Sequence, residues 1–352
     1  MEQLEVDGSY GEGGGQILRT AAAFSVILGR PIHVTRIRSG RKVPGLRQQH
    51  ASALEILRSL SAGRLEGANI GSTEITFVPG EVKGGRLDFD LGTAASITLV
   101  LQAVIPAVAL SGARLSLELT GGTDVPWSPT YDYFSKVVRE TFSRIGVKFS
   151  PKAGRRGYYP RGGGKVSAEV EPCAAVTPLS MAEIPSSHSA RLLSRCGRLP
   201  RHVAQRQLDS ATSTLEAKGI KVAETSLTEE ESDSPGSSLL AYDARPGIVV
   251  GADSIGSRGK RAEEVGTEAA DQFATVCGSG ACIDSNLADM VAPILALSKG
   301  PSKIRIPQVS LHLDTSLHVA RLFTGCEWNA EKDGRSFIVS ISPRLANAEH
   351  NV

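Results

Sequence analysis

The chain has 352 residues, of which 41% are hydrophobic and 22% are charged, and its formal net charge at pH 7 is +2. This composition is ordinary for a globular protein with room for two domains, and so small a net charge requires any basic site to be local. The longest apolar stretch, residues 97–110, is too short to span a bilayer, and the first residues lack the apolar core of a signal peptide. We therefore expect a cytoplasmic protein without a membrane segment.

A glycine-rich segment, DGSYGEGGGQILRT (7–20), precedes an apolar run that predicts a helix from about Gln16. The free N–H groups at a helix start favour an anion. The segment is not a P-loop, because no Gly-Lys-Ser/Thr follows, and it lacks the spacing of a dinucleotide fingerprint. Glu12 would repel an anion unless it holds a metal ion or a proton, whereas Arg19 could face the same anion. The alternative is a glycine-rich surface turn.

Two arginine-rich segments lie further along the chain. In RIRSGRKVPGLRQQH (36–50), the arginines suit phosphate oxygens, and the alternative is a solvated basic loop. In GRRGYYPRGGGK (154–165), basic residues alternate with Tyr158 and Tyr159. That pattern suits single-stranded nucleic acid, whose bases stack while its phosphates pair, and the alternative is a basic turn.

A helix, a glycine-containing corner and a strand recur in three segments, 17–37, 97–119 and 287–306. The interval between the second and third corners exceeds the first interval by roughly 100 residues, which indicates a repeated unit of about 80 residues with a separate domain between units two and three. Residues 180–280 alternate between strand and helix patterns, and the polar stretch 228–238 predicts a loop.

The histidines and cysteines give weaker indications. His312 lies at the predicted junction between the last strand and helix of the third unit, where it is either structural or, if neutral and oriented, a covalent nucleophile. The five cysteines are widely spread and have no Cys-x-x-Cys spacing, so they do not predict a zinc site. Cys277 and Cys282 are near enough in sequence to be bridged, but we expect buried free thiols.

Taken together, these segments resemble the RNA 3'-terminal phosphate cyclase family. The resemblance covers nearly the whole chain in the family's order and includes DGSYGEGGGQILRT, RIRSGRKVPGLRQQH, LGTAASITLVLQ, GGTDVPWSP, GYYPRGGG, LADMVAP and His312. It implies an α/β (α+β) fold of three repeated two-helix, four-strand units forming a large domain, with a smaller α/β domain inserted before the third repeat. We expect the large domain at 1–180 and 281–340, the inserted domain at 181–280 and a flexible tail at 341–352.

The resemblance also implies a ligase-type enzyme that converts an RNA 3'-terminal phosphate to a 2',3'-cyclic phosphate. A histidine takes AMP from ATP and releases pyrophosphate, AMP passes to the RNA 3'-phosphate to give RNA(3')pp(5')A, and the neighbouring 2'-OH closes the ring and expels AMP. Arginines and a divalent metal, Mg or Mn, would stabilise the charge that moves at phosphorus. The implied partners are ATP and RNA with a 3'-phosphate end, and the oligomeric state is left open.

Carried onto this chain, the resemblance makes His312 the nucleophile. The implied catalytic positions are His312, Glu12, Arg19, Arg38, Arg41 and Gln49, with Glu12 also the metal-binding position. The implied cofactor-binding positions, for ATP, are Gln102, Asn286, Leu287, Ala288, Asp289 and Met290. This chain departs from the family pattern at two positions: Asn286 stands where relatives often have an aromatic residue or histidine, and Ser316 replaces the asparagine of the usual His-x-x-Thr-Asn.

Two other functions use related sequences or repeated units. A ribosome-assembly relative without cyclase chemistry would lack the nucleophilic histidine, so His312 argues against that function. An enolpyruvyl transferase would not need both the 36–50 segment and the 154–165 segment, and incubation with shikimate phosphate discriminates between the two enzymes.

Overall fold

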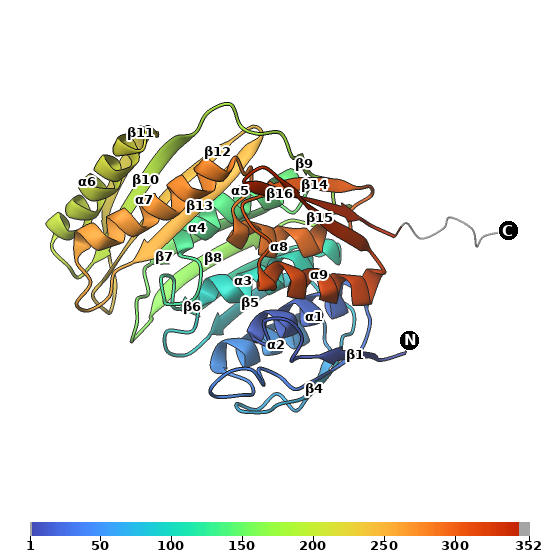
Figure 1. The fold of residues 1–352 in the computed structure, drawn as a ribbon. Coiled ribbons are helices and arrows are strands. Elements are labelled where there is room, and N and C mark those ends of the chain that lie inside the picture. The colour runs from blue at the N-terminus through green and yellow to red at the C-terminus, as the bar shows by residue number, and fades with distance from the viewer. Residues whose placement is uncertain (1, 345–352) are drawn as a thin grey trace.

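The computed structural model describes residues 2–344 as a mixed α/β protein with four four-stranded sheets, which confirms the predicted fold class (Figure 1). Of the predicted tail, residues 341 and 342 belong to the last strand, and residues 345–352 lie outside the described residues.

In three of the sheets the strands lie in the order first, second, fourth, third of their unit, with the first two strands parallel and the other neighbours antiparallel. Each of these three units runs strand, helix, strand, helix, strand, strand. The first contains β1 (Leu4–Asp7), α1 (Gly15–Leu28), β2 (Ile32–Thr35), α2 (Gln48–Leu60), β3 (Arg64–Glu66) and β4 (Ile75–Val78). The second contains β5 (Gly85–Asp90), α3 (Ile97–Leu110), β6 (Leu115–Gly121), the consecutive turns α4 (Tyr131–Tyr133), η1 (Phe134–Val138) and α5 (Arg139–Arg144), β7 (Phe149–Arg155) and β8 (Gly164–Val170). The third contains β9 (Ser180–Met181), α8 (Ser285–Leu295), β14 (Ser302–Ile306), α9 (Leu311–Thr324), β15 (Glu327–Asp333) and β16 (Ser336–Ser342).

The fourth sheet lies between β9 and α8 in the chain, and Figure 1 shows it at one end of the molecule, with two helices lying along it. Its elements are β10 (Ser189–Gly197), α6 (Arg201–Ala217), β11 (Lys221–Glu230), β12 (Gly236–Arg245), β13 (Ile248–Ile255) and α7 (Ala262–Ser279). It has a hydrophobic cluster of its own, formed with α6 and α7. The domain boundaries near 180 and 281 stay a prediction.

The loop predicted at 228–238 is shorter in the structure, because β11 continues to Glu230 and β12 begins at Gly236. The acidic end of β11 is stabilised as a strand by arginines: Glu230 pairs with Arg195, and Glu229 with Arg201. Polar composition alone therefore gave the wrong boundary here.

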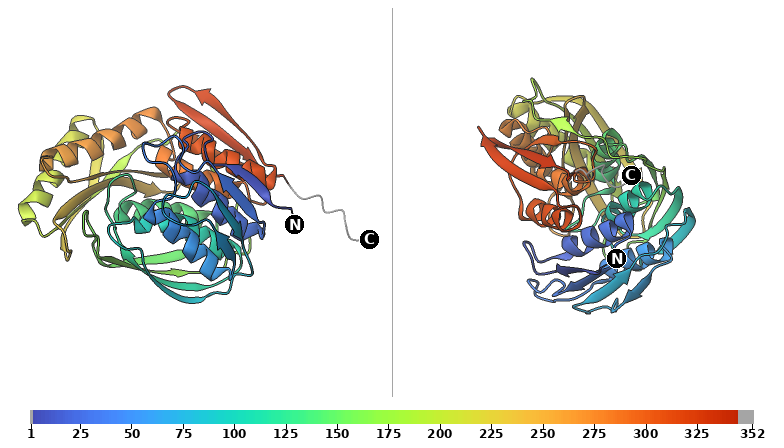
Figure 2. Two further views of the ribbon diagram at one scale, coloured as in Figure 1. Left: turned by 90° about the horizontal axis from the view of Figure 1, so that it is seen from below. Right: turned by 90° about the vertical axis from the view of Figure 1, so that its right-hand side faces the viewer.

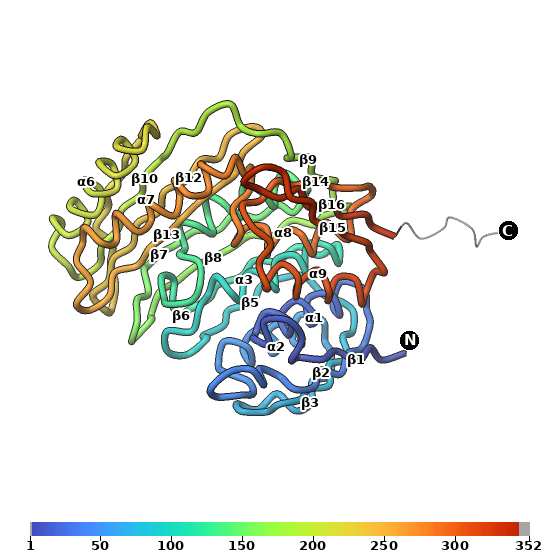
Figure 3. Tube along the Cα trace, in the orientation of Figure 1, coloured from blue at the N-terminus to red at the C-terminus, as the bar shows by residue number. Residues whose placement is uncertain are grey.

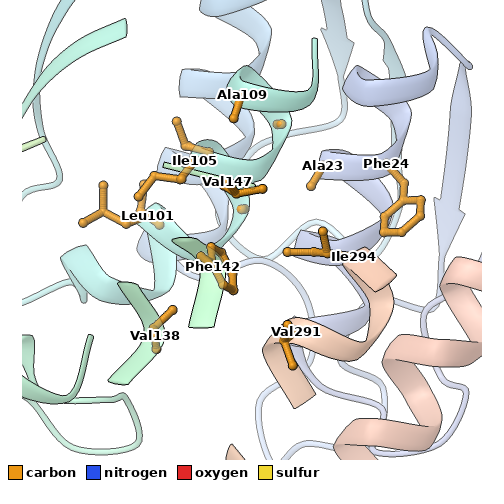
Figure 4. Close-up of a cluster of buried hydrophobic side chains, with 14 of the residues drawn as sticks. Ala23, Phe24, Leu101, Ile105, Ala109, Val138, Phe142, Val147, Val291 and Ile294 are labelled. Carbon is orange, nitrogen blue, oxygen red and sulfur yellow. The ribbon is translucent and has the colours of Figure 1, made fainter. Parts of the chain in front are cut away.

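The helices of the three units meet in the centre of the molecule. Helix α1 packs against α2, α3 and α9, and α8 packs against α9, as the views in Figures 2 and 3 show. Nearly every residue of α3 is buried, which suits a helix covered on all sides. Figure 4 shows the resulting core, with Phe24 of α1, Leu101 of α3, Phe142 of α5 and Ile294 of α8. One continuous core thus fixes the helix starts relative to one another.

All five cysteines are buried free thiols, as expected from the sequence. Burial raises the pKa of Cys277 to about 12, so its thiolate is scarce at neutral pH. Within residues 2–344, no helix combines the length and the apolar character that crossing a bilayer requires.

Candidate functional site

Several helices begin around one region of the molecule. The first two turns of α1, α2, α3, α8 and α9 all contribute side chains to two adjoining cavities. Helix α1 has no side-chain cap, and the first turns of α1, α2, α3 and α8 contain no acidic residue. Free N–H groups and aligned helix dipoles make such a region favourable for anions.

The first cavity, which we call the arginine cavity, has a volume of about 500 Å³. It is lined by Glu12, Gly15, Gln16, Arg19, Arg38, Arg41, Arg47, Gln49, His50, Leu99, Trp127 and His312. The second, which we call the interface cavity, has a volume of about 490 Å³. It lies between the central helices and the fourth sheet, which we call the inserted sheet because it interrupts the third unit. The two cavities share Gln16, Arg19, Leu99, Trp127 and His312. All predicted catalytic residues therefore face the arginine cavity, and His312 stands where the two cavities meet.

The arginines of the arginine cavity differ in what they contact. Arg41 forms an ion pair with Glu12, and Arg38 donates to the backbone oxygens of its own loop at Val43 (3.0 Å) and Gly45 (2.9 Å). Within the described part of the chain, Arg19 and Arg47 form no ion pair. Burial lowers the pKa of Arg19 to about 10, so it still carries its charge at pH 7. Positive charge held in a cavity without a matching carboxylate favours an anionic ligand.

His312 is the second residue of α9, whose N-terminus is capped by Ser310. Its side chain is half-exposed, and Nδ1 lies 3.9 Å from Oε2 of Glu12. Burial lowers the pKa of His312, and the nearby charges of Arg19 and Arg41 lower it further. The imidazole is therefore neutral at pH 7, as a nucleophile must be.

The glycine-rich segment packs against parts of the protein far away in sequence. The N–H of Glu12 donates to Oγ1 of Thr315 on α9 (3.1 Å), and a Cβ on Gly11 would overlap that hydroxyl. A Cβ on Gly15 would overlap the ring of His50 on α2. These two glycines thus allow close approach to neighbouring helices, which sets Glu12 beside His312.

His50 is a site residue to which the sequence assigned no role. It is buried, and its Nδ1 accepts the backbone N–H of Arg47 (3.2 Å). Burial lowers the pKa of His50 to about 3, assisted by the charges of Arg19, Arg38 and Arg47, so the ring is neutral. Because Nδ1 is an acceptor, the proton lies on Nε2. The only sequence signal was its position beside Gln49.

The interface cavity contains most of the predicted ATP-binding positions. Gln102, Asn286, Asp289 and Met290 line it, whereas Leu287 and Ala288 are fully buried in the core and face neither cavity. The Nε2 of Gln102 is buried and has no hydrogen-bond partner within residues 2–344. A buried amide that has no protein partner and lies beside a cavity can donate to a ligand or to water in that cavity.

Asp289 and Gln16 connect α8 to α9 and α1. The Ser310 hydroxyl donates to Oδ1 of Asp289 (2.6 Å), and burial raises the pKa of Asp289 to about 7. The side-chain amide of Gln16, another residue without an assigned role, lies within hydrogen-bond distance of the backbone oxygens of Asp289 (3.3 Å) and His312 (3.4 Å). These contacts fix the spacing between His312 and the α8 residues.

The predicted metal position, Glu12, faces an arginine rather than other acids. Within residues 2–344, no group of three or more His, Cys, Asp or Glu side chains could hold a metal ion. A divalent cation at Glu12 would therefore take most of its oxygen ligands from a bound phosphate chain or from water, as magnesium commonly does.

The second arginine-rich segment, 154–165, does not reach the site. Arg156 is buried and pairs with Asp124 (3.2 Å) and Asp132 (2.9 Å), and Tyr158 is buried as well. Arg155 pairs with Asp233 on the inserted sheet's side. This segment joins the second unit to the inserted sheet. The inserted sheet and the segment that follows it supply wall residues of the interface cavity that the sequence did not indicate, namely Asp253 of β13, Lys260 of the next loop and Glu268 of α7.

Comparisons with known proteins identify the family. A family model described as RNA 3'-terminal phosphate cyclase matches residues 10–330. Curated proteins named RNA 3'-terminal phosphate cyclase are similar to this chain along their length. The protein of Pyrococcus furiosus is 42% identical over 91% of this chain and 93% of its own. The protein of Caldivirga maquilingensis is 40% identical over 97% of this chain and 99% of its own. That of Desulfurococcus amylolyticus is 42% identical over 95% of each chain. A solved EPSP synthase from Acinetobacter baumannii aligns with a TM-score of 0.28 and 11% identity, too low a likeness to bear on fold or function. With a family match across most of its length, the chain belongs to the RNA 3'-terminal phosphate cyclase family.

Proposed function

We propose that this protein is an ATP-dependent RNA 3'-terminal phosphate cyclase that acts through a histidine–AMP and an RNA(3')pp(5')A intermediate. The observation that carries the proposal is the position of His312. A neutral imidazole stands at the junction of two cavities: one contains Arg19 and Arg47, which form no ion pair within residues 2–344, and the other contains the Gln102 amide, which has no hydrogen-bond partner there. The relatives' names supply the reaction class, and the geometry supplies a role for each cavity.

In the first step, His312 attacks the α-phosphorus of ATP and pyrophosphate leaves. Glu12 lies 3.9 Å from Nδ1, where its negative charge favours the proton, so we assign Nε2 as the attacking atom. Arg19 lines both cavities and stabilises the charge that develops on the phosphoryl oxygens.

The nucleoside of ATP occupies the interface cavity in this proposal. A volume of about 490 Å³ is within the range of small-molecule sites. Its wall includes Leu99, Pro129 and Met290 as apolar surface, and the unpartnered Gln102 amide as a donor. Asn286 offers no ring for adenine, so adenine stacking by that residue is absent.

The 3'-phosphate of RNA occupies the arginine cavity. One of its oxygens attacks the phosphorus of the His312 adduct, which breaks the N–P bond and gives RNA(3')pp(5')A. The adjacent 2'-OH then attacks the 3'-phosphorus, loses its proton and expels AMP. Arg19 and Arg47, which have no carboxylate partner within residues 2–344, neutralise the phosphate during both steps.

A divalent cation, Mg or Mn, would bind at Glu12 together with phosphate oxygens. When bound, it would neutralise charge on the leaving pyrophosphate. The cytoplasmic location stays a prediction.

The test is a cyclisation assay with two matched oligoribonucleotides that carry a 3'-phosphate. With ATP and Mg or Mn, the ordinary end is expected to become resistant to phosphatase, with one AMP released per end. An end whose last nucleotide is 2'-deoxy lacks the attacking hydroxyl and should accumulate as RNA(3')pp(5')A. Release of AMP from ATP without either RNA product would contradict the proposal.

A further inference from the structure

Trp127 is exposed to a degree that packing does not explain. Its side chain is 97% exposed, in the loop between β6 and α4. Its backbone φ is +62°, a conformation that bulky residues rarely adopt because of steric strain. The residue thus contributes almost no buried area and occupies a strained conformation, a combination that clusters at ligand-binding sites.

The loop that carries Trp127 is held at several points. The Ser128 hydroxyl donates to the backbone oxygen of Val125 (2.9 Å), and the Thr98 hydroxyl donates to that of Pro129 (2.8 Å). The Thr130 N–H donates to Asp253 of the inserted sheet (2.7 Å). The indole is therefore presented by a fixed support, which lowers the entropy that a stacking contact would cost.

Trp127 lines both the arginine cavity and the interface cavity, as His312 does. If the RNA 3'-phosphate lies in the arginine cavity, the base of the same nucleotide is one ribose away from it, close to the edge of the cavity where Trp127 lies. In the proposed function, the adenine of ATP lies elsewhere, in the interface cavity against Leu99, Pro129 and Met290. An exposed ring at a rim suits a polymer that continues into solvent.

We propose that Trp127 is a stacking platform for a nucleobase of RNA next to the 3'-phosphate. The proposal rests on the proposed function, which places that phosphate in the arginine cavity. Stacking on a π-face is independent of base identity, so the platform accepts RNA ends of any sequence.

The test uses the full chain with Trp328→Phe, so that Trp127 is the remaining tryptophan. The probes are a short oligoribonucleotide with a 3'-phosphate, the same oligonucleotide with abasic sugars at its last two positions, and ATP alone. We expect saturable quenching of indole fluorescence by the first probe and little by the other two. Quenching by ATP equal to that by RNA, or equal binding of the abasic probe, would overturn the proposal.

Trp127→Asn supplies the matched variant, because asparagine tolerates a positive φ and has no aromatic ring. It should weaken binding of the intact oligonucleotide about tenfold, the order expected for one lost base stack, and Trp127→Phe should lie between. The loss in RNA affinity should exceed any loss in protein–AMP formation at least severalfold, and the melting temperature should not fall. A lower melting temperature with an equal loss in both reactions would show a structural role and overturn the proposal. If the unsubstituted protein forms no AMP adduct, the proposed function fails, and base-dependent quenching would still support the stacking platform.

Discussion

The two arginine-rich segments look alike in sequence and differ in what their arginines meet. In 154–165, Arg156 is buried between Asp124 and Asp132, with its guanidinium 4.7 Å from the ring centre of Tyr131. In 36–50, Arg47 faces a cavity and forms no ion pair within residues 2–344. The surroundings of each arginine therefore decide its role. An arginine paired with buried acids stabilises the fold, whereas an arginine that faces a cavity can bind a ligand.

The difference has an energetic basis. A buried ion pair gains little over an apolar pair, but removing one member leaves an uncompensated buried charge. Removing an arginine that faces a cavity and has no ion pair leaves no carboxylate uncompensated, and it relieves repulsion among neighbouring cations. A substitution in 154–165 that breaks a buried ion pair is therefore expected to cost much more stability than a substitution of an arginine in the arginine cavity.

The largest effect on stability is expected from Arg156→Ala. It removes the cation that pairs with buried Asp124, leaves Asp132 with Arg195 alone, and should lower the free energy of unfolding by about 3–5 kcal/mol. The adjacent Arg155→Ala removes a more exposed pair with Asp233 and should cost at most about 1 kcal/mol. Urea unfolding followed by circular dichroism measures both. An equal loss of unfolding free energy in the two variants would contradict the distinction between buried and exposed arginine pairs.

Arg19→Met tests the other side of the comparison. It removes a cation that has no ion pair within residues 2–344 while keeping an apolar stem of similar length. The rate of protein–AMP formation should fall about 100- to 1,000-fold, as when one transition-state donor is lost. The free energy of unfolding should not fall by more than about 1 kcal/mol. Large destabilisation with normal adenylation would place Arg19 with the structural arginines.

The pH dependence of adenylation sharpens the role of Arg41. The pKa of His312 is lowered, so adenylation should be constant at neutral pH and fall only as the pH drops through that lowered pKa, below 6.5. Arg41→Ala removes one lowering charge and frees Glu12 beside Nδ1, and both changes raise the pKa of His312. The acid limb of the rate profile should therefore move to higher pH. Arg36→Ala, which breaks an exposed pair with Asp7, is the control that should leave the limb in place.

The smallest effect is expected from Arg38, which stands between the two classes. Its guanidinium donates to the backbone of Val43 and Gly45, so Arg38→Ala should cost about 1 kcal/mol of stability. If Arg38 also contacts an RNA phosphate, the slope of log K for RNA binding against log salt concentration should be less steep in Arg38→Ala, by the amount that about one phosphate contact contributes. The same loss of stability with an unaltered salt dependence of RNA binding would show that Arg38 stabilises its loop and does not bind RNA phosphate.

The parts of this protein that follow from local pattern were predictable. Apolar periodicity predicted α1, α3 and α8, and the six catalytic positions implied by the family resemblance all line the arginine cavity, whereas Leu287 and Ala288 of the implied ATP-binding positions line neither cavity. What a residue meets across the fold was not predictable. Gly11 approaches Thr315, and Gly15 approaches His50, only because α9 and α2 pack against α1. Composition likewise could not distinguish Arg156 from Arg47, since the acids beside Arg156 and the cavity beside Arg47 come from segments distant in sequence.

The position of His312 as the adenylated residue is the central claim, and one measurement tests it most directly. The protein is incubated with α-labelled ATP and Mg or Mn, and acid-labile label on the protein is counted for the unsubstituted chain, His312→Ala and His318→Ala. His318 is the matched control, because it lies on the same helix and stacks on Tyr10 at 3.7 Å. We expect label on the unsubstituted protein and on His318→Ala, and none on His312→Ala. Label on His312→Ala would contradict the account.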